Sequence, residues 1–373
     1  MTSPFGALSL DDALTLATRW HREGQADQAE GLYGAIVRAQ PDHFAASLQL
    51  GILLEQRGNP EGALACYETA IRVNPGHALA FTRRALILLR RQWGSPIAAL
   101  PPPMAGTPRI GMSSLGSNGR FGNQLLQYAV LRLYGAEHGI SVETPDWIGR
   151  DLFELNDPWL SAGLVPLREE DADLAASLNR SSAIVYRGVD VRGYFAWHTA
   201  AFVRHKALFQ SLFRLGSKAA TAIAPPVARL RARGRTLVAL HIRHGDFGYG
   251  PFWIAPSAWY RDWLQQIWTD LDDPVLYLAT DDPTVIRDFV DFRPISSADL
   301  MAPLPGAEFL LDFEVLAEAD VVAIANSSFS RVASMLNNQG RCFMRPNPDR
   351  RAMVAFDPWD SPMQLSAEAA AVA

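Results

Sequence analysis

Residues 236–246 read TLVALHIRHGD. The apolar run that opens this stretch predicts a strand buried on both faces, as in a parallel sheet. Three polar residues, His241, Arg243 and Asp246, stand at the end of the run. Ligands of open α/β sheets bind beyond the carboxyl ends of the strands, so we expect these side chains to line a functional site. A structural Arg–Asp pair and a core histidine are the alternatives that the residues leave open.

The pattern extends to both sides of this stretch, because short apolar runs alternate with helix-like segments from residue 109 onward. Such alternation is typical of α/β folds. The predicted strands are 109–115, 183–187, 236–242, 274–279, 320–325 and 341–344. The predicted helices are 123–138, 199–213, 256–271, 282–289 and 327–338. We place the join between two α/β halves within 214–235, which gives halves of 108–215 and 216–350 and a C-terminal segment with an Ala-rich tail at 351–373.

The N-terminal part of the chain repeats itself every 34 residues. The positions Ala29, Tyr33, Ile36 and Pro41 recur as Ala63, Tyr67, Ala70 and Pro75. This period is typical of tetratricopeptide (TPR) repeats, in which small residues stand where two helices cross. We therefore predict a short all-α TPR segment over 8–93 and a Pro-rich linker at 94–107. A protein partner on the TPR segment and a plain helical hairpin without a partner are both open.

Composition excludes several classes of function. Apolar residues make up 49% of the chain and charged residues 20%, which is ordinary for a globular protein, and the formal net charge is −5. No block of Lys and Arg stands out, so we expect no nucleic-acid partner. No stretch approaches the ~20 apolar residues of a membrane span, and the first residues do not resemble a signal peptide. The two cysteines, Cys66 and Cys342, lie far apart. A reducing compartment fits best, so we expect a cytoplasmic protein and leave peripheral attachment to the inner membrane face open.

A glycine-rich turn follows the first predicted strand. Residues 116–124 read GSNGRFGNQ and lead into a predicted helix. Gly119 and Gly122 would let the backbone approach a phosphate, and the start of the helix offers free N–H groups. A plain strand-to-helix connection is equally compatible with such a turn.

The ends of two predicted strands carry charged residues. The planar guanidinium of Arg243 could hold two phosphate oxygens, and Asp246 could hold that arginine or accept a proton. We expect Asp281, at the end of the next strand, to contact ligand hydroxyls or a neighbouring residue of the site. Asp282 precedes a proline in a turn and is predicted to cap the following helix.

The segment 309–336 carries further candidates. Asp312 precedes a predicted helix, and Ser327 and Ser328 open another. Hydroxyls at a helix N-terminus cap the helix and can also cradle an anion, and both roles can hold at once. Among the tryptophans, which we expect mostly in the core, Trp253 is the one placed to stack on a sugar.

Four segments resemble, in order, the motifs of the α1,2-fucosyltransferases, which form glycosyltransferase family 11. They are GRFGNQLLQYAVLRLYGAEHG at 119–139, GYFAWH at 193–198, HIRHGD at 241–246 and DFEVLAEADVVAIANSSFS at 312–330. The run LATDDP at 278–283 and Arg331 are also similar to α1,6-fucosyltransferases. The likeness covers roughly residues 109–340.

This resemblance implies a GT-B-type pair of Rossmann-like domains, with GDP-fucose bound mainly by the second. Carried over, Arg243 would hold the β-phosphate, and Asp312 would face the guanine edge beside His241. The other positions carried over as donor-binding are Gly119, Gly122, Asn123, Gln124, Asp281, Ser327 and Ser328. The implied fold class is thus α/β, a GT-B-type pair preceded by a short all-α TPR segment.

The implied reaction is an inverting transfer of fucose to a hydroxyl of a glycan or protein acceptor. Arg243 would stabilise the departing diphosphate, and Asp246 is the candidate base. The α1,6 enzymes carry a catalytic Glu after the H-x-R motif, whereas the corresponding stretch here, FGYGPFW at 247–253, has no carboxylate. Two alternatives stay open: a non-catalytic TPR adaptor whose α/β part binds a nucleotide or sugar, and a transferase with another nucleotide-sugar donor.

The sequence also lacks several metal and hydrolase motifs. It has no HExxH, no paired CxxC, no Walker lysine and no G-x-S-x-G, which argues against metalloprotease, zinc-site, P-loop and α/β-hydrolase functions. Asp270 and Asp272 spell D-x-D, a metal-binding pattern of another glycosyltransferase architecture, but we interpret them as a solvated helix end. We expect no metal and no cofactor other than the donor substrate.

Overall fold

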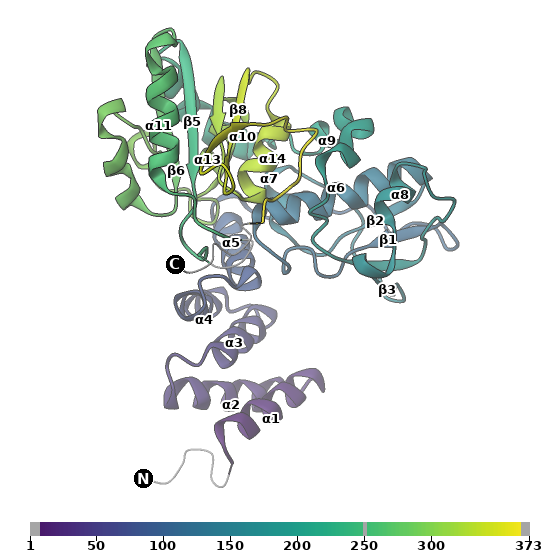
Figure 1. Cartoon of the computed structure of the whole chain (residues 1–373). Helices are drawn as coiled ribbons and strands as arrows, with labels where there is room; N and C mark the ends of the chain where they lie inside the picture. The colour runs from purple at the N-terminus through teal and green to yellow at the C-terminus, as the bar shows by residue number, and fades with distance from the viewer. Residues whose placement is uncertain (1–7, 249–251, 367–373) are drawn as a thin grey trace. The chain divides into compact units, whose positions relative to one another are not determined.

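The chain forms two compact units, Met1–Gly94 and Ser95–Ala373. A computed structural model describes residues 8–248 and 252–366 (Figure 1). The predicted Ala-rich tail lies almost entirely outside the described residues, and so do residues 249–251 of the FGYGPFW stretch. In the described ranges, no helix has the length and apolar character that a bilayer span requires.

The first unit consists of helices throughout its described part. They are α1 (Leu10–Arg22), α2 (Ala26–Ala39), α3 (Phe44–Gln56), α4 (Pro60–Val73) and α5 (Ala78–Trp93). The repeat-related Tyr33 and Tyr67 are fully buried. A Cβ on Gly51 would lie 2.8 Å from the ring of Tyr67, so α3 and α4 cross at a contact that only a very small residue allows.

The second unit begins with a four-stranded sheet in the order β2-β1-β4-β3, with all neighbouring strands parallel. The strands are β1 (Arg109–Gly111), β2 (Ser141–Glu143), β3 (Val165–Arg168) and β4 (Val189–Arg192). The helical segments of this half are α6 (Phe121–His138), α7 (Ile148–Leu152), η1 (Glu169–Asp171), α8 (Leu174–Leu178), η2 (Thr199–His205) and α9 (Lys206–Leu212).

The prediction of a strand at 183–187 was wrong. That segment is irregular, and the N–H of Tyr186 donates to the hydroxyl of Tyr134 rather than to a neighbouring strand. The strand in this region is β4, a few residues later, where Val189 pairs with Ile110 of β1. Strands β2 and β3 were not predicted, because they are three and four residues long, read SVE and VPLR, and carry no apolar run.

The remaining five strands form a second sheet in the order β6-β5-β7-β8-β9. They are β5 (Thr236–Ile242), β6 (Pro274–Thr280), β7 (Val321–Ala323), β8 (Cys342–Asn347) and β9 (Ala352–Ala355). All pairs are parallel except β8 with β9. Every residue of β5 is buried, as its apolar run predicted. The second sheet therefore extends past the predicted boundary at residue 350, because β9 continues it as an antiparallel edge strand.

Helices cover both faces of the second sheet. The predicted join at 214–235 contains α10 (Ser217–Arg231). One face packs against α11 (Ser257–Ile267) and η4 (Pro283–Phe292) through a core that includes Leu240, Trp263 and Phe289. On the other face, α13 (Leu310–Glu318) packs against β5, α10 and α14 (Ser328–Leu336). The short segments η3 (Trp268–Asp270) and α12 (Ser297–Leu300) complete this half.

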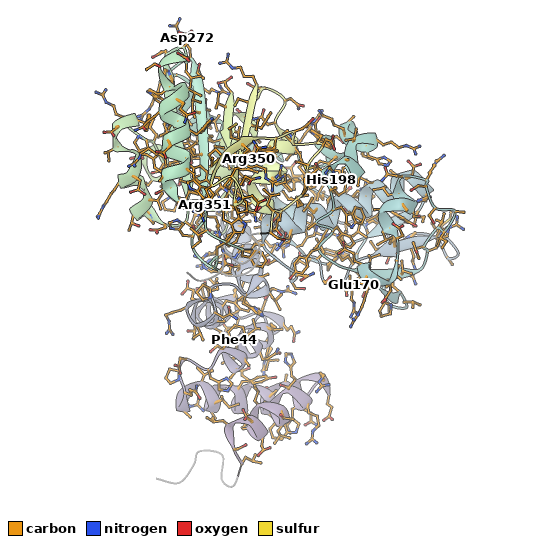
Figure 2. All side chains as sticks on the ribbon, viewed as in Figure 1. Phe44, Glu170, His198, Asp272, Arg350 and Arg351 are labelled. Carbon is orange, nitrogen blue, oxygen red and sulfur yellow. The ribbon has the colours of Figure 1, made fainter. Side chains whose placement is uncertain are left out.

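Two Rossmann-like halves within one compact unit, preceded by a helical unit, confirm the predicted fold class. The D-x-D residues take no part in the sheet edges that face ligands in such folds. Asp272 is exposed at the surface beside the end of α11, where it pairs with Arg235 at 2.7 Å (Figure 2).

Candidate functional site

The glycine-rich turn of the first half touches the start of α14 in the second half. A Cβ on Gly122 would lie 2.4 Å from the backbone nitrogen of Phe329 and 2.6 Å from the carbonyl carbon of Ser328. Real Cβ atoms do not approach backbone atoms this closely, so the contact requires glycine. The two helices α6 and α14 thus meet at their first turns, which brings both sets of helix N-terminal N–H groups to the same place.

Two buried glutamines fix the shape of this turn. The Gln124 amide donates to the carbonyl of Gly119 at 3.1 Å, and the Gln127 amide donates to the carbonyl of Asn118 at 2.8 Å. Gln124 is 2% exposed, so the structure places it behind the turn rather than on its open side. Asn123 lies against Gly119, where an added Cβ would come within 2.5 Å of its amide nitrogen.

Phe121, between Arg120 and Gly122 of the turn, enters an aromatic cluster of the second half. Its ring lies 4.5 Å from that of Phe309, 5.2 Å from Phe313 and 6.5 Å from Phe329, centroid to centroid. Aromatic pairs at these separations stabilise the fold by more than the burial of their apolar area alone. Phe121 was not predicted as a site residue, although an aromatic residue inside a glycine turn is unusual enough to indicate a packing role.

Arg243 lies at the carboxyl end of β5 between two carboxylates. Its guanidinium forms an ion pair with Asp246 and another with Asp281, the latter at 2.6 Å. Asp281 also accepts a hydrogen bond from the backbone N–H of His244 at 2.8 Å. A Cβ on Gly245 would lie 2.2 Å from the Asp281 carboxylate, so this glycine makes room for the carboxylate that holds the arginine.

A second guanidinium, that of Arg120 in the glycine-rich turn, also reaches the carboxylate of Asp246. Arg120 Nη2 lies 3.5 Å from Asp246 Oδ2. Burial, followed by the nearby charge of Arg243, lowers the pKa of Arg120. Arg120 and Arg243 therefore converge on Asp246 from the two halves of the second unit. No role was predicted for Arg120, because nothing in the sequence relates the turn to the end of β5.

The two guanidiniums change the acidity of Asp246. Burial raises its pKa, but the charges of Arg243 and Arg120 and the hydrogen bond from Arg243 outweigh burial, and the pKa lies below its ordinary value. A carboxylate with a lowered pKa is a weak proton acceptor. The geometry thus suits Asp246 to holding the arginines.

A histidine–aspartate pair stands beside Arg243. Nδ1 of His244 lies 2.9 Å from an Asp282 oxygen, and the other oxygen of Asp282 accepts hydrogen bonds from the N–H and hydroxyl of Thr284. Hydrogen bonds from Thr284 and then His244 lower the pKa of Asp282 to about 2. A carboxylate at Nδ1 favours the tautomer whose lone pair is on Nε2. Asp282 was predicted as a helix cap, a role it has at η4, whereas no role was predicted for His244.

His241 and Asp312 lie on the same face of the second sheet. His241 is buried, and its Nδ1 lies 2.8 Å from the hydroxyl of Ser330 on α14. Burial and then the charge of Arg243 lower the pKa of His241 to about 3, which keeps the ring neutral. Asp312 accepts a hydrogen bond from the hydroxyl of Tyr277 at 2.5 Å, and burial raises its pKa to about 7.

The remaining predicted residues lie around α14 and the C-terminal segment. Ser327 is the N-cap of α14, and its hydroxyl accepts from the N–H of Phe329 at 3.3 Å. Ser328 is the first helical residue. The indole N–H of Trp253 donates to the carbonyl of Leu365 at 2.9 Å, so this tryptophan holds the C-terminal segment. Among residues 8–248 and 252–366, no three His, Cys, Asp or Glu side chains are grouped to hold a metal ion.

Comparisons with known proteins add a family for part of the chain. The sequence profile of the tetratricopeptide repeat matches residues 21–87. No curated protein sequence matches the chain.

Several solved structures are similar to the chain. NodZ α-1,6-fucosyltransferase of Bradyrhizobium, soaked with GDP-fucose, has 14% identity and a TM-score of 0.43 over 67% of this chain and 96% of that chain. FUT1 of Arabidopsis thaliana in complex with GDP has 12% identity and a TM-score of 0.45 over 83% of this chain and 80% of that one. O-GlcNAc transferase of Thermobaculum terrenum has 13% identity and a TM-score of 0.22 over 90% and 50%. At such low identities and scores, the reaction must be argued from the site itself.

Gly122→Ala is expected to destabilise the second unit by about 1–3 kcal/mol, because the added methyl forces the backbones of α6 and α14 apart. Chemical denaturation of the full chain measures the loss. Gly31→Ala adds the same methyl to α2, where nothing lies within 4 Å, and should be neutral or stabilising by up to ~1 kcal/mol. Equal stability of the two variants would contradict the proposed contact.

Asp312 predicts a pH dependence of stability. Its folded pKa of about 7 lies above that of an unfolded Asp, ~3.9, so the folded chain holds a proton that the unfolded chain releases. The contribution of Asp312 is fully present below the unfolded pKa and is lost as the pH rises through the folded one. Asp312→Asn keeps an acceptor for Tyr277 but cannot ionise, so its melting temperature should fall less between pH 5 and pH 8.

The control for this pH series is Asp272→Asn, which changes an exposed carboxylate. Its profile should follow that of the wild type. If Asp312→Asn instead loses as much stability as the wild type over this range, Asp312 does not titrate there.

Proposed function

We propose that the protein is a glycosyltransferase that transfers fucose from GDP-fucose to a hydroxyl of a glycan or protein acceptor, with inversion and without a metal. The observation that carries the proposal is the convergence of Arg120, from the glycine-rich turn, and Arg243, from the end of β5, on Asp246. Paired guanidiniums at the carboxyl edge of a sheet are suited to the charges of a diphosphate.

In this proposal the diphosphate binds between the two arginines and the first turn of α14. Ser327, Ser328 and the backbone of the glycine-rich turn supply N–H groups and the positive ends of two helices. The negative charge that develops on the departing β-phosphate is stabilised there electrostatically. Asp281 and Asp246 keep the Arg243 guanidinium oriented before the donor arrives.

The nucleoside end of the donor is assigned to the region of His241 and Asp312. The neutral ring of His241 can exchange hydrogen bonds with a base, and Asp312 could accept from the guanine edge. Support for GDP and for fucose comes from the sequence motifs at 119–139, 241–246 and 312–330, which resemble those of fucosyltransferases.

Transfer requires a group that removes the acceptor proton, and we assign this role to His244. The acceptor oxygen forms a bond to the anomeric carbon while the bond from that carbon to the β-phosphate oxygen breaks, and GDP leaves with the electron pair. The acceptor proton passes to Nε2 of His244, whose Nδ1 is held by Asp282. Asp246, the base expected from the sequence, instead acts by orienting the arginines, because its pKa is lowered.

The TPR segment offers a surface for a protein partner, since its repeats match the tetratricopeptide family. Such a partner could carry the acceptor. This role is separate from the reaction, because every residue assigned above to the donor or to the acceptor proton lies in the second unit.

Arg243→Ala is expected to lower GDP release from GDP-fucose, in the presence of a panel of glycan acceptors, by a hundredfold or more, a loss of ~3 kcal/mol in transition-state stabilisation. Arg120→Ala should act in the same direction. Arg350→Ala removes an exposed arginine and should leave turnover unchanged (Figure 2). Wild-type turnover in Arg243→Ala would refute the assignment. If GDP raises the melting temperature of the wild type but the wild type produces no GDP from GDP-fucose, the protein is an adaptor and not a transferase. If only UDP or ADP raises the melting temperature, the donor carries a different nucleotide.

His244→Gln is expected to abolish acceptor-dependent GDP release while GDP still raises the melting temperature, because the imidazole handles the proton and not the diphosphate. Asp282→Asn should weaken turnover less and alter its pH profile, since it acts through the histidine. The control is His21→Gln in the first unit. Full turnover in His244→Gln would show that another group takes the proton, without bearing on the arginines.

A further inference from the structure

Two arginines, one on α14 and one on β8, are buried around the ring of Phe356, which follows β9. Arg331, on α14, is 0% exposed and Arg345, on β8, is 4% exposed. Their guanidinium carbons lie 4.1 Å and 5.9 Å from the ring centre of Phe356. The two positive charges therefore share the same small region of the interior.

The hydrogen-bond acceptors around this pair are all uncharged. Arg331 Nη1 donates to the hydroxyl of Ser361 at 2.9 Å, and Arg345 donates to the carbonyl of Pro362 at 2.8 Å and to the side-chain oxygen of Asn326 at 3.4 Å. In the ranges 8–248 and 252–366, Nε and Nη2 of Arg331 have no hydrogen-bond acceptor. No carboxylate of these ranges pairs with either guanidinium.

An arrangement of this kind is costly unless an anion completes it. A guanidinium keeps its proton in proteins, and a buried charge without a counter-charge is unfavourable. The second guanidinium adds repulsion, which the contact with Phe356 offsets only in part. Burial and then the charge of Arg345 hold the pKa of Arg331 well below its ordinary value, in keeping with an uncompensated positive charge.

The unsatisfied atoms of Arg331 also have a defined geometry. Nε and Nη2 form one edge of the guanidinium plane, and their N–H bonds point in parallel. This edge is the one that binds two oxygens of an oxyanion, or a single halide, in bidentate fashion. A water molecule could accept these hydrogen bonds, but it would leave both positive charges uncompensated.

We propose that Arg331, supported by Arg345, binds one small inorganic anion in the interior of the second unit. The site is distinct from the donor site, since none of its residues contributes to the paired arginines at Asp246. It nevertheless lies on α14, whose first residue, Ser328, abuts Gly122. The bound anion therefore stabilises the helix on which the contact between the two halves depends.

Thermal unfolding of the full chain tests the proposal with chloride as the probe. Sodium chloride is exchanged for sodium gluconate, whose anion is too large, at constant ionic strength. The melting temperature of the wild type should rise with chloride and keep rising with the logarithm of its concentration above the dissociation constant. Arg331→Met should lose this dependence, whereas Arg350→Met, which removes an exposed charge, should retain it. Identical chloride responses in all three proteins would overturn the proposal.

A second measurement does not depend on the folding of a variant. Crystals of the wild-type protein grown in bromide should show an anomalous peak in contact with Nε and Nη2 of Arg331. A water molecule at this position, with no bromide signal, would overturn the proposal even if chloride stabilised the protein elsewhere.

Discussion

The second unit depends on one close approach between two backbones, that of the glycine-rich turn and that of the first turn of α14. Gly122 permits the approach because it has no Cβ to meet Ser328 and Phe329. Phe121, the preceding residue, fills the space beside the contact with a ring that packs on Phe309 and Phe313. Gly122 thus allows the two backbones to approach, and Phe121 supplies the buried apolar area beside them. Neither residue could take the role of the other. Arg120 reaches Asp246 only because this contact holds the turn in place.

The long elements could be predicted from sequence, and the short ones could not. Strand β5 follows from a largely apolar run, in which Leu237–Leu240 carry no polar residue and every position is buried, as expected of a strand covered on both faces. Strands β2 and β3 owe their existence to their neighbours: they pair with β1 and β4 over a few residues, and no local preference marks them. The run at 183–187 has suitable residues for a strand but no partner, because the N–H of Tyr186 bonds to Tyr134. Pairing, and not propensity, decides these cases.

In the candidate site, too, some features could be predicted from the sequence and others could not. The end of β5 indicated Arg243 and Asp246 individually, because their place in the chain implies their place on the sheet edge. Which charges meet is a property of the fold, and so Arg120 and the pair of His244 with Asp282 could not be inferred. The type of a residue also does not show which way its side chain points. Gln124, which the sequence resemblance implies as a donor-binding residue, donates its amide N–H to the carbonyl of Gly119. It serves the turn by shaping it.

The two arginine clusters differ in how their charge is balanced, and the difference bears on what each can do. Arg120 and Arg243 stand with two carboxylates, Asp246 and Asp281, so the cluster is close to neutral and its guanidiniums are oriented in advance. An incoming diphosphate must then compete with Asp246, which weakens general attraction to anions but favours a ligand that can engage both arginines at once. Arg331 and Arg345 lack any such carboxylate among the described residues. A site without internal compensation binds whatever small anion fits, and its occupant acts as part of the fold instead of as a substrate.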